Sequence, residues 1–208
     1  MTSPDAQKSL TVVRVLRAAS QLFASKGYDA TTIEDIADKS GVALSEATAI
    51  FPTPEKALQA LLDHDLSTAY ELAQVEAASA DIAVVRFFRY IAKDLAWVLS
   101  SPYDLMGIDR KDVITRPEFA PWHEKLVFLR AFRLDMIQEA IDDGDFMSVS
   151  PKFAQEAMTS IIMGTLEEHR GSPADDPQAQ GVELATLAVR SLLKNVDSIE
   201  SIRAAAGF

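Results

Sequence analysis

Apolar residues recur at helical spacing along almost the whole chain, and this periodicity constrains the fold more than any other feature of the sequence. Glycines, prolines and N-cap residues divide the pattern into segments. Helices are predicted over residues 7–25, 33–40, 45–51, 54–79, 82–101, 118–143, 151–170 and 177–206, with 102–117 irregular or holding one short helix. No segment has the alternation of a strand, so the predicted fold is all-α with about nine helices.

The first three predicted helices have the features of a three-helix, helix-turn-helix domain. Thr31 or Thr32 can cap the second helix, whose first turn is acidic, as the helix dipole favours. Gly41 can adopt the left-handed conformation that the turn needs. Ala37 is small enough to let the third helix approach, and Val42 can fill the space between the helices.

A longer stretch makes the resemblance specific. The pattern Arg14-x-Leu16-x-Ala18-Ala19-x-x-Leu22-Phe23-x-x-x-Gly27-Tyr28-x-x-Thr31-Thr32-x-x-x-Ile36-Ala37-x-x-x-Gly41-Val42 is similar to the signature of TetR-family transcriptional regulators. The spacing to Phe51 and the helix opening at Glu55 also resemble that family. The segment from Glu183 to Leu193 resembles its last helix.

The resemblance implies a ligand-responsive DNA-binding regulator, a repressor that works as a homodimer. Residues 1–54 would form the helix-turn-helix DNA-binding domain, and residues 55–208 the ligand-binding and dimerisation domain. The third helix would enter the major groove of a palindromic operator, and an effector would move the fourth helix. No cofactor is expected.

The DNA-contacting residues are expected around the turn and on the third helix: Thr31, Thr32, Leu44, Ser45, Glu46, Thr48, Ala49 and Lys56. The family usually has Ser, Gly, Tyr and Lys where this chain has Ala43, Ser45, Thr48 and Pro54. That Tyr and that Lys commonly contact the phosphate backbone, whereas Thr48 can donate one short hydrogen bond and Pro54 none.

The charge balance bears on the same question. The chain carries 20 basic and 31 acidic side chains, for a net charge of −11. Residues 1–58 have six Lys or Arg and seven Asp or Glu, so the DNA-binding part has no basic excess. An acidic protein is repelled by DNA unless its positive charge is localised.

Two interpretations therefore stay open. In the first, Ser45 replaces Ala43 as the N-cap of the third helix, and Glu46 accepts a hydrogen bond from a cytosine amino group in a specific operator. In the second, the chain is a TetR-fold dimer with weakened or lost operator binding that acts through protein interaction or ligand sequestration. Glu46, Thr48 and Pro54 favour the second interpretation.

The C-terminal part is rich in aromatic residues and methionines, the side chains that line apolar ligand pockets. The expected effector is a mostly apolar small molecule. The candidate ligand-binding residues are Trp97, Met106, Trp122, His123 and Phe128. The alternative, which helical spacing favours for any single one of the aromatic residues, is a place in the core, and for His123 a solvated or core position. Trp97, Met106 and Trp122 flank the irregular segment, where the helices would diverge.

The last two predicted helices contain more large apolar residues than a small domain can bury alone, which favours a homodimer. These residues are Ile161, Ile162, Leu166, Leu184, Leu187, Leu192 and Leu193.

Catalysis has little support in the sequence. The three histidines are isolated, and there is neither a cysteine, nor a glycine-rich phosphate loop, nor a nucleophile elbow, nor a metal-ligand pattern. No apolar run is long enough to span a membrane, and no secretory signal is evident, so a cytoplasmic protein is expected.

Overall fold

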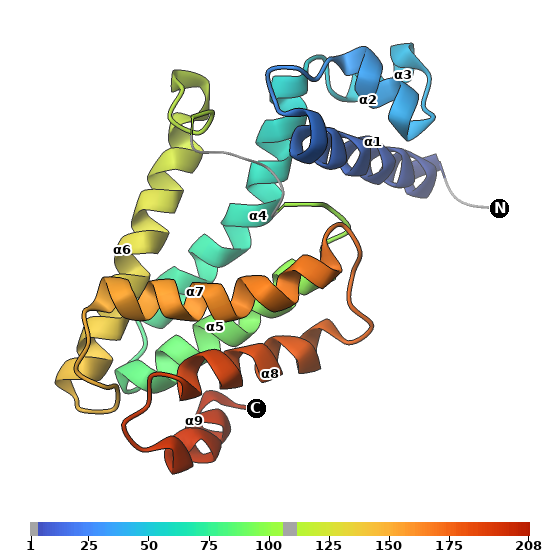
Figure 1. The fold of residues 1–208 in the computed structure, drawn as a ribbon. Helices are drawn as coiled ribbons and strands as arrows, with labels where there is room; N and C mark the ends of the chain where they lie inside the picture. The colour runs from blue at the N-terminus through green and yellow to red at the C-terminus, as the bar shows by residue number, and fades with distance from the viewer. Residues whose placement is uncertain (1–3, 106–111) are drawn as a thin grey trace. The chain divides into compact units, whose positions relative to one another are not determined.

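The computed structural model describes residues 4–105 and 112–208, and within them the chain is all-α, as predicted (Figure 1). Nine α-helices form in this part of the chain: α1 (Pro4–Lys26), α2 (Ile33–Ser40), α3 (Leu44–Ile50), α4 (Pro54–Ala77), α5 (Ala83–Ser100), α6 (Ala120–Asp142), α7 (Pro151–Leu166), α8 (Pro177–Arg190) and α9 (Ile199–Ala206). Three short 3₁₀ segments accompany them: η1 (Pro117–Phe119), η2 (Glu167–His169) and η3 (Val196–Ser198).

Several helix starts follow from local sequence signals. The hydroxyl of Ser150 accepts a hydrogen bond from the backbone of Phe153, and Pro151 opens α7. Asp176 caps α8 in the same way, again with proline as the first helical residue. Proline fits there because the first N–H groups of a helix have no intrahelical partner.

The prediction of one final helix from Pro177 to Ala206 is wrong. The helix ends at Arg190, and α9 begins only at Ile199. Between them, the backbone pairs with the loop that follows α6: Met147 donates to the Leu192 carbonyl across 2.8 Å, and Lys194 donates to the Asp145 carbonyl across 2.9 Å. These long-range bonds satisfy the backbone groups that a continuous helix would have used.

The described chain divides into two compact units. The first comprises residues 1–65, 101–123 and 170–172, and the second comprises residues 66–100, 124–169 and 173–208. The domain boundary after residue 54 stays a prediction. The first unit nevertheless includes more than the helix-turn-helix, because residues 54–65 of α4 and the described residues 101–105 and 112–123 also belong to it.

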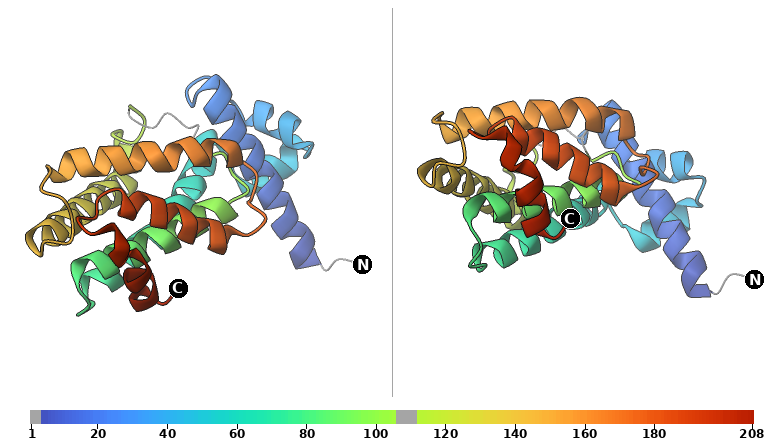
Figure 2. Two further views of the ribbon diagram at one scale, coloured as in Figure 1. Left: turned by 60° about the horizontal axis from the view of Figure 1, so that its bottom comes forward. Right: turned by 90° about the horizontal axis from the view of Figure 1, so that it is seen from below.

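The second unit is built around the contact between α5 and α8, which lie along each other in both views of Figure 2. Gly181 on α8 makes this contact possible. A Cβ atom there would lie 2.7 Å from the backbone nitrogen of Ala96 and 2.8 Å from the carbonyl oxygen of Ala92. Such distances are too short for any side chain, so only glycine allows the two backbones to approach this closely. Ala185 and Ala188 extend the small-residue contact surface and are fully buried.

Candidate nucleic-acid interface

Helix α2 begins with a complete capping box. The Thr32 hydroxyl accepts from the Asp35 amide, and the Asp35 carboxylate accepts from the Thr32 amide across 2.9 Å. Lys26 also donates to this carboxylate. The hydrogen bond from Lys26, followed by those from Thr32, lowers the pKa of Asp35 to about 2. The start of α2 is therefore locally well specified.

The turn between α2 and α3 has the predicted geometry. Gly41 adopts the left-handed conformation with a φ of 63°. The Arg14 guanidinium lies over it and donates to the carbonyls of Ser40 and Gly41, at 2.7 and 3.0 Å. It thereby satisfies carbonyls at the end of α2 that lack helical partners. Ala37 and Val42 are buried, as expected for residues between the two helices.

Helix α3 presents most of the predicted DNA contacts on its outer side. Ala47 is fully buried and anchors the helix. The exposed residues of α3 are Leu44, Ser45, Glu46 and Ala49. The suggestion that Ser45 caps this helix is wrong: α3 begins at Leu44, its N-cap position is Ala43, and no side chain caps it. Ser45 is thus a solvent-facing residue of the first turn.

Thr48, which replaces the usual tyrosine, uses its hydroxyl within the helix. The Oγ1 atom donates to the Leu44 carbonyl at 2.8 Å and also lies 3.2 Å from the Ser45 carbonyl. The proton is therefore engaged by the backbone and not presented to solvent. Pro54 begins α4 and has no N–H to offer.

The remaining two candidates differ in accessibility. Thr31 is 5% exposed, and its hydroxyl donates to the Gly27 carbonyl across 2.7 Å, so its side chain has a structural role. Lys56 is exposed and close to Glu55, and its ammonium donates to the Gln59 side chain. Exposed ion pairs are weak, so the Lys56 ammonium can leave Glu55 and bind a DNA phosphate at little cost in free energy.

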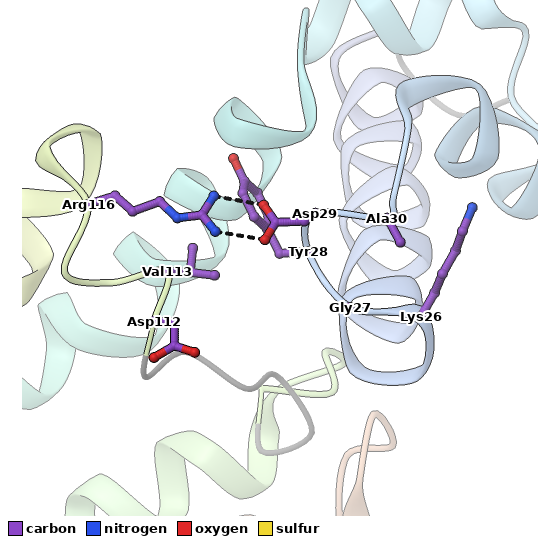
Figure 3. Close-up of a pocket in the computed structure, with 8 residues that line it drawn as sticks. All are labelled: Lys26, Gly27, Tyr28, Asp29, Ala30, Asp112, Val113 and Arg116. Atoms are coloured by element: carbon purple, nitrogen blue, oxygen red, sulfur yellow. Dashed lines mark hydrogen bonds and ion pairs between the residues drawn. The ribbon is translucent and has the colours of Figure 1, made fainter.

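Behind the helix-turn-helix, Arg116 binds the loop between α1 and α2. Its two terminal nitrogens each lie 2.7 Å from a carboxylate oxygen of Asp29, a bidentate pair that lowers the pKa of that carboxyl (Figure 3). The guanidinium also lies 5.5 Å from the ring centre of Tyr28, which packs edge-on against Phe119. A cavity of about 260 Å³ adjoins the pair, lined by residues 26–30 together with Asp112, Val113 and Arg116.

A second set of bonds joins α1 to the residues just after α5. The Ser20 hydroxyl accepts from the Asp104 amide across 3.1 Å, and Arg17 donates to the Pro102 carbonyl across 3.2 Å. The Asp104 carboxylate in turn is bound by Arg170 through two nitrogens, at 3.1 and 3.0 Å. Residues 101–105 and 112–119 thus hold the helix-turn-helix at two places.

The predicted effector residues do not all belong to one compact unit. Trp122 and His123 lie in the first unit, where the Trp122 indole donates to Asp63 across 2.9 Å. Trp97 and Phe128 lie in the second and are half-buried. Met106 falls outside the described residues.

No sequence signal pointed to several residues of these sites. Asp29 and Arg116 are 87 positions apart, so only the fold brings them together. The same holds in the second unit for Lys125 of α6 with Tyr70 of α4, and for Arg133 of α6 with Tyr90 of α5. Helical spacing identifies a helix but not the partner that its polar residues meet.

Comparison with known proteins supports the sequence resemblance. Residues 15–45 match the family model of bacterial regulatory proteins of the tetR family. Among curated proteins, no sequence matches the chain significantly. No helix of the described residues has the length and apolar character needed to cross a membrane.

Several solved structures share the fold. AmtR of Mycobacterium smegmatis superposes with a TM-score of 0.68 at 20% identity, over 91% of this chain and 90% of that chain. The ketosteroid transcriptional regulator KstR2 of Mycobacterium tuberculosis gives 0.64 at 17% identity, over 93% of this chain and 98% of the other. A regulatory protein in the tetR family from Rhodococcus RHA1 gives 0.60 at 20% identity, over 92% and 98%.

At these identities the structural matches concern the fold alone, whereas the family model matches the helix-turn-helix in sequence. The described fold and the matched segment agree with each other, because the segment covers the capping box, the Gly41 turn and the start of α3. The helix-turn-helix of this chain is thus similar in sequence to that of bacterial regulatory proteins of the tetR family, and the chain shares its fold with the solved structures.

Proposed function

We propose that this chain is a homodimeric repressor that binds a palindromic operator through α3 and is released by a small, mostly apolar effector. The observation that carries the proposal is the outer side of α3, where Leu44, Ser45, Glu46 and Ala49 are exposed while Ala47 is fully buried. A recognition helix needs this combination of a firm attachment and a free face. A repressor of this kind acts in the cytoplasm, where bacterial operators lie.

Fluorescence anisotropy with duplexes from around the protein's own gene, at two salt concentrations, tests operator binding. We expect one duplex to bind more tightly than random DNA, and its affinity to fall as salt rises, because phosphate contacts release counterions. Equal and weak binding of specific and random duplexes at low salt would exclude the repressor.

A second function is favoured by the chemistry of the α3 surface. Thr48 has its proton engaged by the backbone, Pro54 has none to donate, and Glu46 adds a negative charge. On these grounds the chain would be a TetR-fold dimer that has lost most of its operator affinity and acts through protein interaction or ligand sequestration. The combined variant Glu46→Thr, Thr48→Tyr and Pro54→Lys should then gain general DNA affinity. No gain would count against this alternative.

Ligand responsiveness is supported by the bonds that residues 101–105 and 112–119 make to α1 and its following loop. These residues flank the positions where we expect the effector. A ligand that displaces them would loosen Asp29 from Arg116, or Ser20 from Asp104, and so change the position of the helix-turn-helix. Several of the side chains in these bonds are exposed, so water already competes for them. Breaking the bonds therefore costs little free energy.

Dimerisation is supported by apolar side chains that α7 and α8 leave exposed. Leu187 is 58% exposed, and Ile161 and Met163 are each 37% exposed. The other predicted interface residues are less available to a partner. Ile162 is half-buried, and four leucines are buried within this one chain: Leu166, Leu184, Leu192 and Leu193. We therefore assign the interface to Ile161, Met163 and Leu187.

Sedimentation at micromolar concentration tests the dimer. Leu187→Glu should give a monomer, because it places a charge in an apolar interface. The matched control is Val75→Glu on α4, since Val75 is 63% exposed and lies outside the proposed interface. A wild-type monomer, or equal effects of the two substitutions, would exclude this interface.

A further inference from the structure

Two basic residues of α6 differ from the other lysines and arginines in the described part of the chain. Four partly buried arginines pair with carboxylates: Arg86 with Glu139, Arg89 with Glu76, Arg116 with Asp29 and Arg203 with Glu200. Lys125 and Arg133 are also half-buried, but no described carboxylate lies within ion-pair distance of either. In a chain with a net charge of −11, two unneutralised cations in partly buried positions are unexpected.

Both cations have neutral partners only. The Lys125 ammonium donates to the Ser67 hydroxyl across 3.0 Å and lies 5.9 Å from the ring centre of Tyr70. The Arg133 guanidinium donates one bond, of 3.3 Å, to the phenol oxygen of Tyr90. An ammonium has three N–H donors and a guanidinium has five, so most of their hydrogen-bonding capacity is unused by the protein.

A row of four aromatic rings runs between the two cations, all within the second unit. Tyr70 of α4 lies 4.9 Å from Phe128, measured between ring centres, and Phe128 stacks on Phe132 at 6.4 Å. Phe132 meets Tyr90 of α5 edge-on at 5.1 Å. Tyr70 and Phe128 are half-buried, so the row is partly open to solvent at that end. Such rings offer apolar contact to a ligand at low entropic cost.

We propose that this face of α4, α5 and α6 binds an amphipathic organic anion whose anionic head is held by Arg133. Lys125, at the other end of the aromatic row, adds to the positive potential of this face. The apolar body of the anion contacts the rings of Tyr70 and Phe128. Partial burial favours the contact, because charge interactions are stronger away from bulk water. We assign this face as the effector site, an assignment that rests on the proposed function. The effector would then be an amphipathic organic anion.

The test uses two dyes with the same aromatic body, anilinonaphthalene sulfonate and the uncharged phenylnaphthylamine, titrated into the full-length protein. Arg133→Gln should weaken binding of the sulfonate about tenfold, the loss expected for one charge-assisted hydrogen bond. The affinity for the uncharged dye should change by less than about twofold, because this dye makes no charge-assisted hydrogen bond. Lys125→Met should also weaken binding of the sulfonate.

Matched controls separate a binding role from a structural one. Arg130→Gln removes the same charge from an exposed position of the same helix and should leave both dyes unaffected. Arg133→Lys keeps the charge and should retain most of the affinity for the sulfonate. Circular dichroism confirms that each variant is folded.

The proposal is overturned if Arg133→Gln and Arg130→Gln have the same effect on the sulfonate. It is also overturned if Arg133→Gln weakens both dyes equally, because the cation would then only shape the aromatic surface. DNA anisotropy with and without the sulfonate tests the proposed function separately. If the dye binds through Arg133 but operator affinity is unchanged, the anion site stands and its effector role fails.

Discussion

Each compact unit contains an arginine–carboxylate pair with a short N–O distance, and the two pairs differ in burial. In the second unit, Arg89 lies 2.9 Å from Glu76, whose side chain is 2% exposed. In the first unit, Arg116 lies 2.7 Å from Asp29, whose side chain is 70% exposed. Water competes for the exposed charges but not for the buried ones, so removing a partner has very different consequences. The exposed bonds around the helix-turn-helix can therefore be exchanged at a lower cost than the buried pair of the second unit.

The largest effect should follow removal of the buried carboxylate. Glu76→Ala leaves the Arg89 guanidinium without its buried partner and should lower the free energy of unfolding by about 3–5 kcal/mol. Denaturant titration measures the loss. Asp81→Ala removes the other carboxylate bound to Arg89, one whose side chain is 52% exposed, and should cost much less. Equal losses would show that burial does not distinguish the two carboxylates.

Close packing in the second unit should give the next largest effect. Gly181→Ala forces α5 and α8 apart, because the new Cβ would lie within 2.8 Å of the backbone at Ala92 and Ala96. We expect a loss of about 2 kcal/mol, typical of overpacked cores. Gly164→Ala on α7 is the matched control, because its Cβ would meet nothing within 4 Å. That control should be neutral or gain up to about 1 kcal/mol from helix propensity.

The exposed pair of the first unit should give a smaller effect that depends on pH. Arg116→Gln removes the hydrogen bonds that lower the pKa of Asp29, so this pKa should rise towards its ordinary value of 3.8. A lowered pKa stabilises the fold above that ordinary value and ceases to do so as pH falls through the folded pKa. The difference in stability between wild type and variant should therefore disappear in acid. Titration by NMR measures the pKa, and Arg203→Gln should leave it unchanged.

The smallest effect concerns the cap of α2. The carboxyl of Asp35 should titrate at about 2, and Lys26→Gln should raise this pKa by removing the largest of its causes. Asp35→Asn should destabilise the protein above pH 3.8, and the effect should fade as pH falls towards about 2. An Asp35 pKa unchanged by Lys26→Gln would contradict the assigned cause.

The parts that were predictable from the sequence depend on neighbours within one turn of helix. The capping box at Thr32, the left-handed Gly41 and the starts of α7 and α8 involve residues no more than three or four positions apart. The prediction of Ser45 as an N-cap failed, although it used the same kind of rule. Ala43 and the Gly41 turn place the start of α3 earlier, and no local side chain caps it.

The parts that were not predictable depend on contacts across the chain. The C-terminal helix breaks after Arg190 because Leu192 and Lys194 bond to the backbone beyond α6. The two α6 cations lie beside aromatic rings of α4 and α5, and no spacing rule pairs residues on different helices.

By itself, the sequence determined that this chain is helical and that its first helices form a TetR-type helix-turn-helix, because periodicity, caps and turn glycines act over a few residues. Only the tertiary structure decided which polar groups meet. It engages the Thr48 proton within α3, pairs Asp29 with Arg116, and leaves Lys125 and Arg133 without a described carboxylate. The physical reason is that long-range pairing depends on how whole helices pack, which no local pattern encodes.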